Sequence, residues 1–103
     1  PYFHLLWDNL AKVYRIQNKL EKAKKAFENL IKIDPKNIEA LIAIGTNYIK
    51  LAEYEEGINA YKKALLINPD NAETYSSMSV ALLQQGKLDE AINACKKSLK
   101  KNN

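Results

Sequence analysis

The chain of 103 residues carries 16 basic and 12 acidic side chains, and this formal net charge of +4 is too modest to indicate a polyanion-binding protein. With 3 Gly and 3 Pro, it has too few turn residues for a β-barrel or β-sandwich, which needs a turn about every ten residues. The single Cys excludes an internal disulfide and gives no reason to prefer an oxidising compartment, so the compartment is left open.

The hydropathy pattern gives no sign of a membrane anchor. The longest apolar run covers residues 40–44, far short of the roughly 18 residues that a membrane-spanning helix needs. We therefore expect no membrane span, and the 47% apolar content fits one compact helical domain.

Residues 4–37 begin with apolar positions at helical spacing and end at a proline. The spaced positions are Trp7, Leu10 and Tyr14, then Leu20, Ala23 and Phe27. Pro35 follows them. Because proline lacks an N–H and restricts the residue before it, Pro35 ends the second helix, and the segment predicts a helical hairpin.

Residues 38–71 repeat this arrangement. Two helical sets flank Ala52 and Glu53, and they comprise Leu41, Ile44, Tyr48 and Leu51, then Tyr54, Ile58, Tyr61 and Leu65. Pro69 ends the second set and begins a short link rich in Asp and Asn. This segment predicts a second helical hairpin.

Residues 72–103 carry the pattern a third time, because one fixed step along the chain takes Trp7 to Leu41 and then to Tyr75. This repeat step also relates Leu10, Ile44 and Met78; Tyr14, Tyr48 and Leu82; Leu20, Tyr54 and Leu88; Ala23, Gly57 and Ala91; Phe27, Tyr61 and Cys95; and Pro35, Pro69 and Asn103. These positions resemble the tetratricopeptide repeat, which has an aromatic, Leu-Gly and Tyr in its first helix and Ala, an aromatic and Pro in its second.

The resemblance covers nearly the whole chain and implies an all-α fold. We expect a right-handed superhelix of three helical hairpins, six helices in all, in a single domain over residues 1–103 with repeats at 4–37, 38–71 and 72–103. Small residues recur where the helices must approach closely, namely Ala11, Gly45 and Ser79 in the first helices and Ala23, Gly57 and Ala91 in the second.

Both ends of the stack look incomplete. The third repeat departs from the family pattern at Leu82, Cys95, Ser98 and Asn103, and the chain begins at Pro1 without a Met. We therefore expect an excerpt of a longer protein. Apolar faces are expected to be exposed at each end, formed by Tyr2, Phe3, Leu6 and Leu10 and by Leu88, Ile92, Cys95 and Leu99.

In the family, the first helices line a concave groove and the second helices form the convex back. The resemblance therefore places nine residues in the groove: Asp8, Lys12, Arg15, Ile42, Thr46, Ile49, Ser76, Val80 and Leu83. The apolar members have no expected role inside the repeat. Our hypothesis is a protein or peptide partner whose apolar side chains meet them and whose acidic groups meet Lys12 and Arg15.

The apolar groove residues also fit two simpler roles. They could pack against a neighbouring helix of the same protein or be scattered surface residues. A rival function is also open, in which the end faces stack into a homo-oligomer and the chain acts as a structural assembly module.

One subset of the family binds the C-terminal tails of heat-shock chaperones through a clamp of Lys, Asn and Arg. The matching positions here are Asp8, Lys12, Ala43, Glu73 and Ser77. The clamp is therefore absent, and the acidic residues would repel a terminal carboxylate. We expect that a chaperone tail is not the partner.

Neither an enzyme nor a cofactor protein is indicated. His4 and Cys95 are the only His and Cys, and they are expected at opposite ends of the stack, where they cannot act as a nucleophile–base pair or form a metal site. Cys95 replaces an aromatic of the family pattern, so we expect it to be a buried apolar residue. No glycine-rich phosphate loop is present, and the aromatics lie at packing positions, which argues against nucleic-acid binding.

Overall fold

The computed structural model describes residues 2–101, and within that range it contains six α-helices and no strand. The helices are α1 (Phe3–Ile16), α2 (Leu20–Ile33), α3 (Ile38–Lys50), α4 (Tyr54–Ile67), α5 (Ala72–Gln84) and α6 (Leu88–Lys101). The predicted all-α fold of six helices is therefore confirmed.

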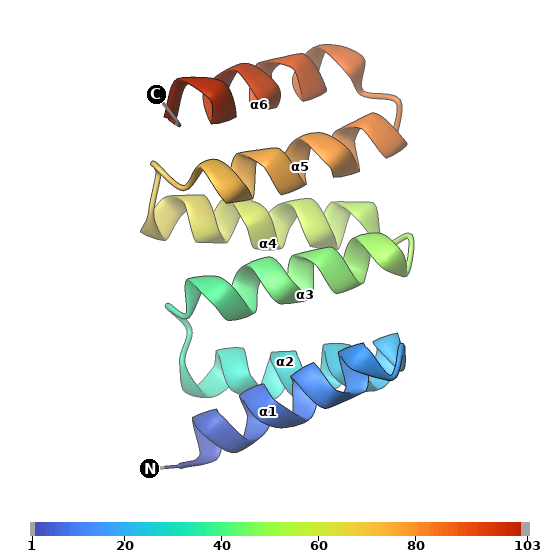
Figure 1. Ribbon diagram of the computed structural model, residues 1–103, viewed down its shortest axis with the longest axis vertical. Helices are drawn as coiled ribbons and strands as arrows, with labels where there is room; N and C mark the ends of the chain where they lie inside the picture. Colours follow the sequence, from blue (N-terminus) through green and yellow to red (C-terminus); the bar gives the residue numbers. More distant parts are fainter. Residues whose placement is uncertain (1, 102–103) are drawn as a thin grey trace.

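The helices pair into three antiparallel hairpins that stack along one direction. Figure 1 shows α1 and α2 at one end of the stack and α6 at the other, with α3, α4 and α5 between them. Contacts within the hairpins join α1 to α2, α3 to α4 and α5 to α6. The hairpins contact one another through α2 against α3 and α4 against α5, so each hairpin rests mainly on its neighbour in the chain.

Asparagine starts the first helix of the second and third hairpins. The Asn37 side-chain oxygen accepts a hydrogen bond from the Ala40 backbone N–H at 3.0 Å, and Asn71 accepts one from Thr74 at 3.0 Å. Each satisfies one of the backbone donors that a helix start leaves without a partner. Each Asn is preceded by the proline of its link, two positions earlier in the sequence. The link therefore ends one hairpin and begins the next.

The turn inside each hairpin contains one residue with left-handed backbone. These residues are Asn18 (φ 59°), Ala52 (φ 62°) and Gly86 (φ 76°), and they occupy the same position in successive repeats. Left-handed backbone is easy for Gly, acceptable for Asn and strained for Ala. The turn geometry is therefore retained even where the residue type does not favour it.

Two clusters of buried side chains form the core. The first contains Phe27 and Leu30 of α2 and Ile44 of α3, and the second contains Tyr61 of α4 and Leu82 of α5. Phe27 and Tyr61 are only 1% and 2% exposed. The remaining signature aromatics, Trp7, Tyr14 and Tyr48, are half-buried and pack against the first cluster. Aromatic residues at the signature positions thus supply core packing.

Two glycines allow α3 and α4 to approach closely. A Cβ on Gly45 would lie 2.6 Å from Cε1 of Tyr61, and a Cβ on Gly57 would lie 2.5 Å from Cδ1 of Ile49 and 2.9 Å from the Gly45 backbone oxygen. A real Cβ cannot occupy either place unless these neighbours move. The predicted close approach at Gly45 and Gly57 is confirmed.

Apolar side chains remain exposed at both ends of the stack, as predicted. Phe3 and Leu6 of α1 are 66% and 59% exposed, and Ile92 and Leu99 of α6 are 51% and 67% exposed. Cys95 is also exposed, so the prediction that it is a buried apolar residue is wrong. The physical reason is that α6 packs mainly against α5, so the rest of its surface is not covered by another helix within residues 2–101.

Relieving the left-handed alanine should stabilise the fold. Ala52→Gly should raise the free energy of unfolding by about 1 kcal/mol, since left-handed backbone costs an L-residue roughly 1–2 kcal/mol and glycine loses part of that gain to chain entropy. The matched reverse change, Gly86→Ala, should lower it by a similar amount. No heavy atom lies within 4 Å of the added Cβ, so only the backbone is tested. Urea unfolding measures both changes, and equal stability of the three chains would contradict the strain.

The contact of Gly57 with Ile49 should appear as an energetic coupling. Gly57→Ala alone should destabilise the fold by about 1–3 kcal/mol through overpacking. Ile49→Val removes the Cδ1 methyl, so the loss caused by Gly57→Ala should shrink by about 1 kcal/mol in the Ile49→Val background. A double-mutant cycle in urea measures the coupling, and strict additivity of the two changes would show that the residues do not touch.

Candidate functional site

The first helices of the three hairpins share one face of the stack, and this face contains a shallow hollow. The hollow has a volume of about 340 Å³. Its lining comes from α1, α3 and α5 alone and consists of Arg15, Glu39, Ile42, Ala43, Thr46, Lys50, Glu73 and Ser77. We call this hollow the groove hollow.

Charge is divided across the groove hollow. Glu39 and Glu73 lie in the first turns of α3 and α5, whereas Arg15 and Lys50 lie in the last turns of α1 and α3. The three first helices run in the same direction across the stack (Figure 1). The groove hollow therefore has an acidic edge along the helix starts and a basic edge along the helix ends.

A partly buried pair of hydroxyl groups lies beneath the groove hollow. The Thr46 hydroxyl donates to the Ile42 carbonyl oxygen at 3.0 Å and lies 2.9 Å from the Tyr61 hydroxyl. Burial raises the pKa of Tyr61 above its ordinary value, so the phenol stays protonated and can donate to Thr46. Thr46 thus faces the groove hollow and at the same time ties α3 to α4.

Ile42 and Ile49 have packing roles that the sequence did not predict. Both are half-buried and pack against the second core cluster. Ile49 also fills the space left by the missing side chain of Gly57. The expectation that the apolar residues of this face have no role inside the repeat is therefore wrong for these two, because α3 lies between two other hairpins.

The other predicted groove residues are divided between α1 and α5. On α1, Lys12 forms an ion pair with Asp8 at 3.0 Å, so its charge is already partly compensated. On α5, Ser76 is exposed, and Val80 and Leu83 are 52% and 61% exposed. Of the nine predicted residues, only Arg15, Ile42 and Thr46 line the groove hollow.

Sequence reasoning missed the two charged residues of α3 that complete the groove hollow. Glu39 stands one repeat step before Glu73, so the recurrence of an acidic residue at this position was the available signal. Lys50 had no such signal, because Gln84 follows it at the equivalent place.

The positions of the chaperone-binding clamp are partly brought together. Ala43, Glu73 and Ser77 line the groove hollow, whereas Asp8 and Lys12 do not and are occupied by their own ion pair. Any carboxylate placed at the three converging positions would face the carboxylate of Glu73 without a cation from that set.

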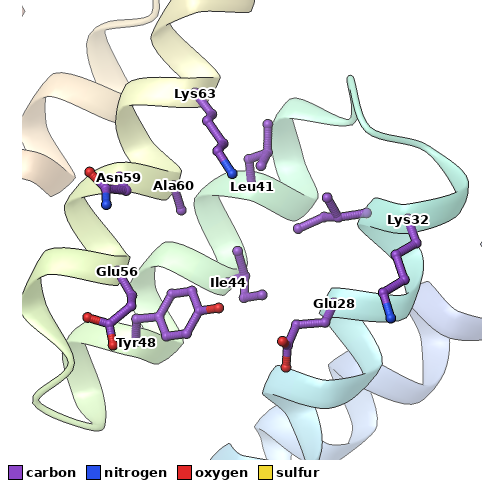
Figure 2. A pocket seen from close by; sticks show the side chains of 10 residues that line it. Glu28, Lys32, Leu41, Ile44, Tyr48, Glu56, Asn59, Ala60 and Lys63 are labelled. Carbon is purple, nitrogen blue, oxygen red and sulfur yellow. The ribbon is translucent and has the colours of Figure 1, made fainter.

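Two further hollows lie on the opposite side, among the second helices. The larger has a volume of about 360 Å³, and Figure 2 shows α2 and α4 around it, with Leu41, Ile44 and Tyr48 of α3 between them. One repeat step takes these three residues to Tyr75, Met78 and Leu82, which line the smaller hollow of about 210 Å³. Because equivalent residues line the two hollows, the packing of one repeat against the next accounts for both of them.

A partly buried ion pair links the first two hairpins near this back surface. The Lys24 amine lies 2.9 Å from Glu53 and 3.2 Å from Glu21, and only 16% of the Lys24 side chain is exposed. The hydrogen bond to Glu53 raises the pKa of Lys24 above its ordinary value. Lys24 also lies over the Tyr48 ring at 5.7 Å, so it joins α2 both to α3 and to the turn that follows α3.

Residues with catalytic or ligating chemistry are dispersed. His4 of α1 and Cys95 of α6 lie at opposite ends of the stack, and both are exposed. Residues 2–101 hold no group of three or more His, Cys, Asp or Glu side chains that could ligate a metal ion. Over the same residues, no helix has the length and apolarity needed to cross a bilayer.

The stack of hairpins is similar in fold to several solved structures, although no curated protein matches the chain. The crystal structure of MamA matches with a TM-score of 0.91 at 25% identity, over 96% of this chain and 58% of MamA. The chain therefore spans little more than half the length of MamA.

Two solved complexes are also similar in fold. The TPR2B domain of yeast Sti1, in complex with pHsp70, matches with a TM-score of 0.93 at 19% identity, over 99% of this chain and 82% of that one. The first TPR of Spaghetti (RPAP3), bound to the HSP90 peptide SRMEEVD, matches with a TM-score of 0.89 at 20% identity, over 95% and 78%.

Three family models match successive parts of the chain. A model described as Tetratricopeptide repeat matches residues 4–37, one described as TPR repeat matches residues 45–86, and another Tetratricopeptide repeat model matches residues 71–102. Together with the three stacked hairpins and their recurring turns and close approaches, these matches show that the chain belongs to the tetratricopeptide repeat family.

Proposed function

We propose that this chain is a protein-interaction scaffold, not an enzyme, and that it holds a peptide or helix of another protein in the groove formed by α1, α3 and α5. The chemistry-bearing residues are dispersed, whereas the groove hollow concentrates hydroxyl, apolar and charged groups on one face. The similar folds of Sti1 and RPAP3 are solved in complex with chaperone ligands, which supports a peptide as the kind of partner.

The observation that carries the proposal is the exposed apolar pair on α5. Val80 and Leu83 are 52% and 61% exposed and, unlike Ile42 and Ile49, do not belong to either core cluster. Burying two such side chains against a partner contributes about 1.5–3 kcal/mol each when burial is complete. The fold thus leaves a large part of the apolar surface of this pair uncovered on the first-helix face.

The charged edges of the groove hollow indicate the chemistry of the partner. Basic side chains of the partner would meet Glu39 and Glu73, and acidic side chains would meet Arg15 and Lys50. Lys12 is a weaker anchor for an acidic group than Arg15, because it is paired with Asp8. A partner that presents charges of both signs fits this face better than one that presents acidic groups alone.

Substitution of Val80 in the apolar pair should weaken peptide binding. Peptides would be selected on the immobilised chain from a displayed library of random sequences, and their affinity would be measured by isothermal titration calorimetry. Val80→Asp should weaken the selected peptides by about tenfold or more, because a buried charge replaces an apolar contact. Glu73→Lys should weaken those peptides that carry basic residues and spare the others.

The control is Leu66→Asp, which introduces the same charge at an 83% exposed leucine of α4 on the back of the stack. It should leave the affinity unchanged, and circular dichroism should show all variants to be folded. Peptides that bind a folded Val80→Asp variant as tightly as the unchanged chain would refute the groove as the binding site, as would a library that yields no binder.

A second function is favoured by a separate observation, the apolar end faces. Phe3, Leu6 and Leu10 on α1 and Leu88, Ile92 and Leu99 on α6 are between 38% and 67% exposed. Exposed apolar patches of this kind mark association surfaces in water-exposed proteins. We infer that the end faces let copies of the chain assemble, so that the scaffold is also a structural module.

Assembly should depend on protein concentration. Sedimentation velocity from micromolar to millimolar concentration should show the mean mass rising above that of a monomer, and the rise should persist in high salt because the faces are apolar. A mass that stays at one chain throughout would eliminate this second function and leave groove binding unaffected.

A further inference from the structure

The exposed stripe of α1 matches positions that the rest of the fold buries. Its members include Leu6, Leu10 and Val13, which are 59%, 38% and 49% exposed. One repeat step takes them to Ala40, Ile44 and Asn47 of α3, which are 2%, 3% and 0% exposed. Ala40 and Ile44 belong to the first core cluster, to which α2 contributes Phe27 and Leu30. The α1 stripe is thus one half of an inter-hairpin contact.

The outer face of α6 supplies the other half. Ile92 and Cys95 are exposed, whereas the residues one repeat step earlier, Ile58 and Tyr61 of α4, are 8% and 2% exposed where α4 meets α5. An inter-hairpin contact of this kind occurs twice inside the chain, as α2 against α3 and α4 against α5. The two ends therefore expose the positions that form the two sides of these inter-hairpin contacts.

The two ends also carry charges of opposite sign at equivalent repeat positions. In the α2–α3 contact, Lys24 brings Glu21 and Glu53 together, at 3.2 Å and 2.9 Å from its amine. The same three positions of the α4–α5 contact hold Ile58, Glu55 and Lys87. In a contact of α6 with α1 they would hold Ile92, Asp89 and Lys19. The set expected between α6 and α1 therefore matches the α4–α5 set in residue type, with one isoleucine, one acidic residue and one basic residue.

The large and the small residue change places at the two ends of the stack. The α4–α5 contact region combines a large residue on the second helix, Tyr61, with a small one on the first, Thr74. At the equivalent positions α6 has Cys95 and α1 has Leu6. A small residue on α6 thus leaves room for the larger one on α1, as close packing requires.

We propose that α6 of one copy docks antiparallel on α1 of a second copy, in the register by which α4 docks on α5. This inference rests on the proposed assembly function and specifies its interface. The contact is heterologous, because each copy presents two different surfaces. Since it repeats the step from one hairpin to the next, it extends the superhelix with further copies and does not close after two.

Two variants test this pairing by disabling one face each. Leu6→Asp places a charge on the α1 stripe and Ile92→Asp places one on the α6 face, at side chains that are 59% and 51% exposed and so tolerate the change. Each variant alone should be a monomer by sedimentation velocity, at concentrations where the unchanged chain assembles. Mixed in equal amounts, they should form a 1:1 heterodimer and nothing larger, because only one intact pair of faces remains.

The controls add the same charge beside each face. Leu5→Asp changes a 49% exposed leucine next to Leu6, at a position where Glu39 and Glu73 stand in the other repeats. Asn93→Asp changes the neighbour of Ile92, which is exposed. Both should assemble like the unchanged chain. Phe3→Asp and Leu99→Asp, at 66% and 67% exposure, replace the first pair if either variant is not helical by circular dichroism.

The outcomes separate this pairing from assembly in general. An unchanged chain that assembles, together with single variants that still assemble or a mixture that stays monomeric, would overturn the α6–α1 contact but keep assembly. An unchanged chain that is monomeric at millimolar concentration would overturn both. The monomeric result would point instead to further helices of the same protein as the segments that cover α1 and α6.

Discussion

The close approach of α3 to α4 is the contact on which the rest of the stack depends. Tyr61 lies against Gly45, and Ile49 lies against Gly57, at places where any side chain on the glycines would collide with them. Because the helices interlock there, the Tyr61 hydroxyl reaches Thr46 at 2.9 Å. The same packing that holds the middle hairpin together therefore also sets the floor of the groove hollow.

The middle hairpin contacts the first hairpin through α3 and the third hairpin through α4. The Lys24–Glu53 ion pair, with 16% of the Lys24 side chain exposed, joins the first hairpin to the second in a setting less screened than the surface pair Lys101–Asp70. A stack in which each hairpin contacts mainly its neighbours gains stability from every interface. Within residues 2–101, its two outer helices expose apolar side chains at positions that the inner helices bury.

Much of the fold was predictable because its causes are local. The helices, the proline-punctuated links and the recurring signature residues follow from spacing along the chain, and Gly45 and Gly57 correctly indicated close approach. The site was less predictable. The packing of Ile42 and Ile49 against the core was not predicted, nor was the place of Glu39 and Lys50 in the groove hollow. For Cys95 the sequence supported both an exposed end face and a buried apolar residue, and the structure shows it exposed. Each depends on which helix lies opposite, and periodicity does not specify that.

The sequence by itself determined three hairpins, the positions of their turns and the residues that begin each new first helix, because backbone hydrogen bonding, proline and capping act within a few residues. It also placed apolar stripes on both outer helices. Only the tertiary structure decided which apolar residues remain available to a partner, since the exposure of Val80 and the burial of Ala40 depend on neighbouring hairpins. It likewise decided that Arg15 and Lys50 face Glu39 and Glu73 across one hollow, because that arrangement requires three helices from separate repeats to lie side by side.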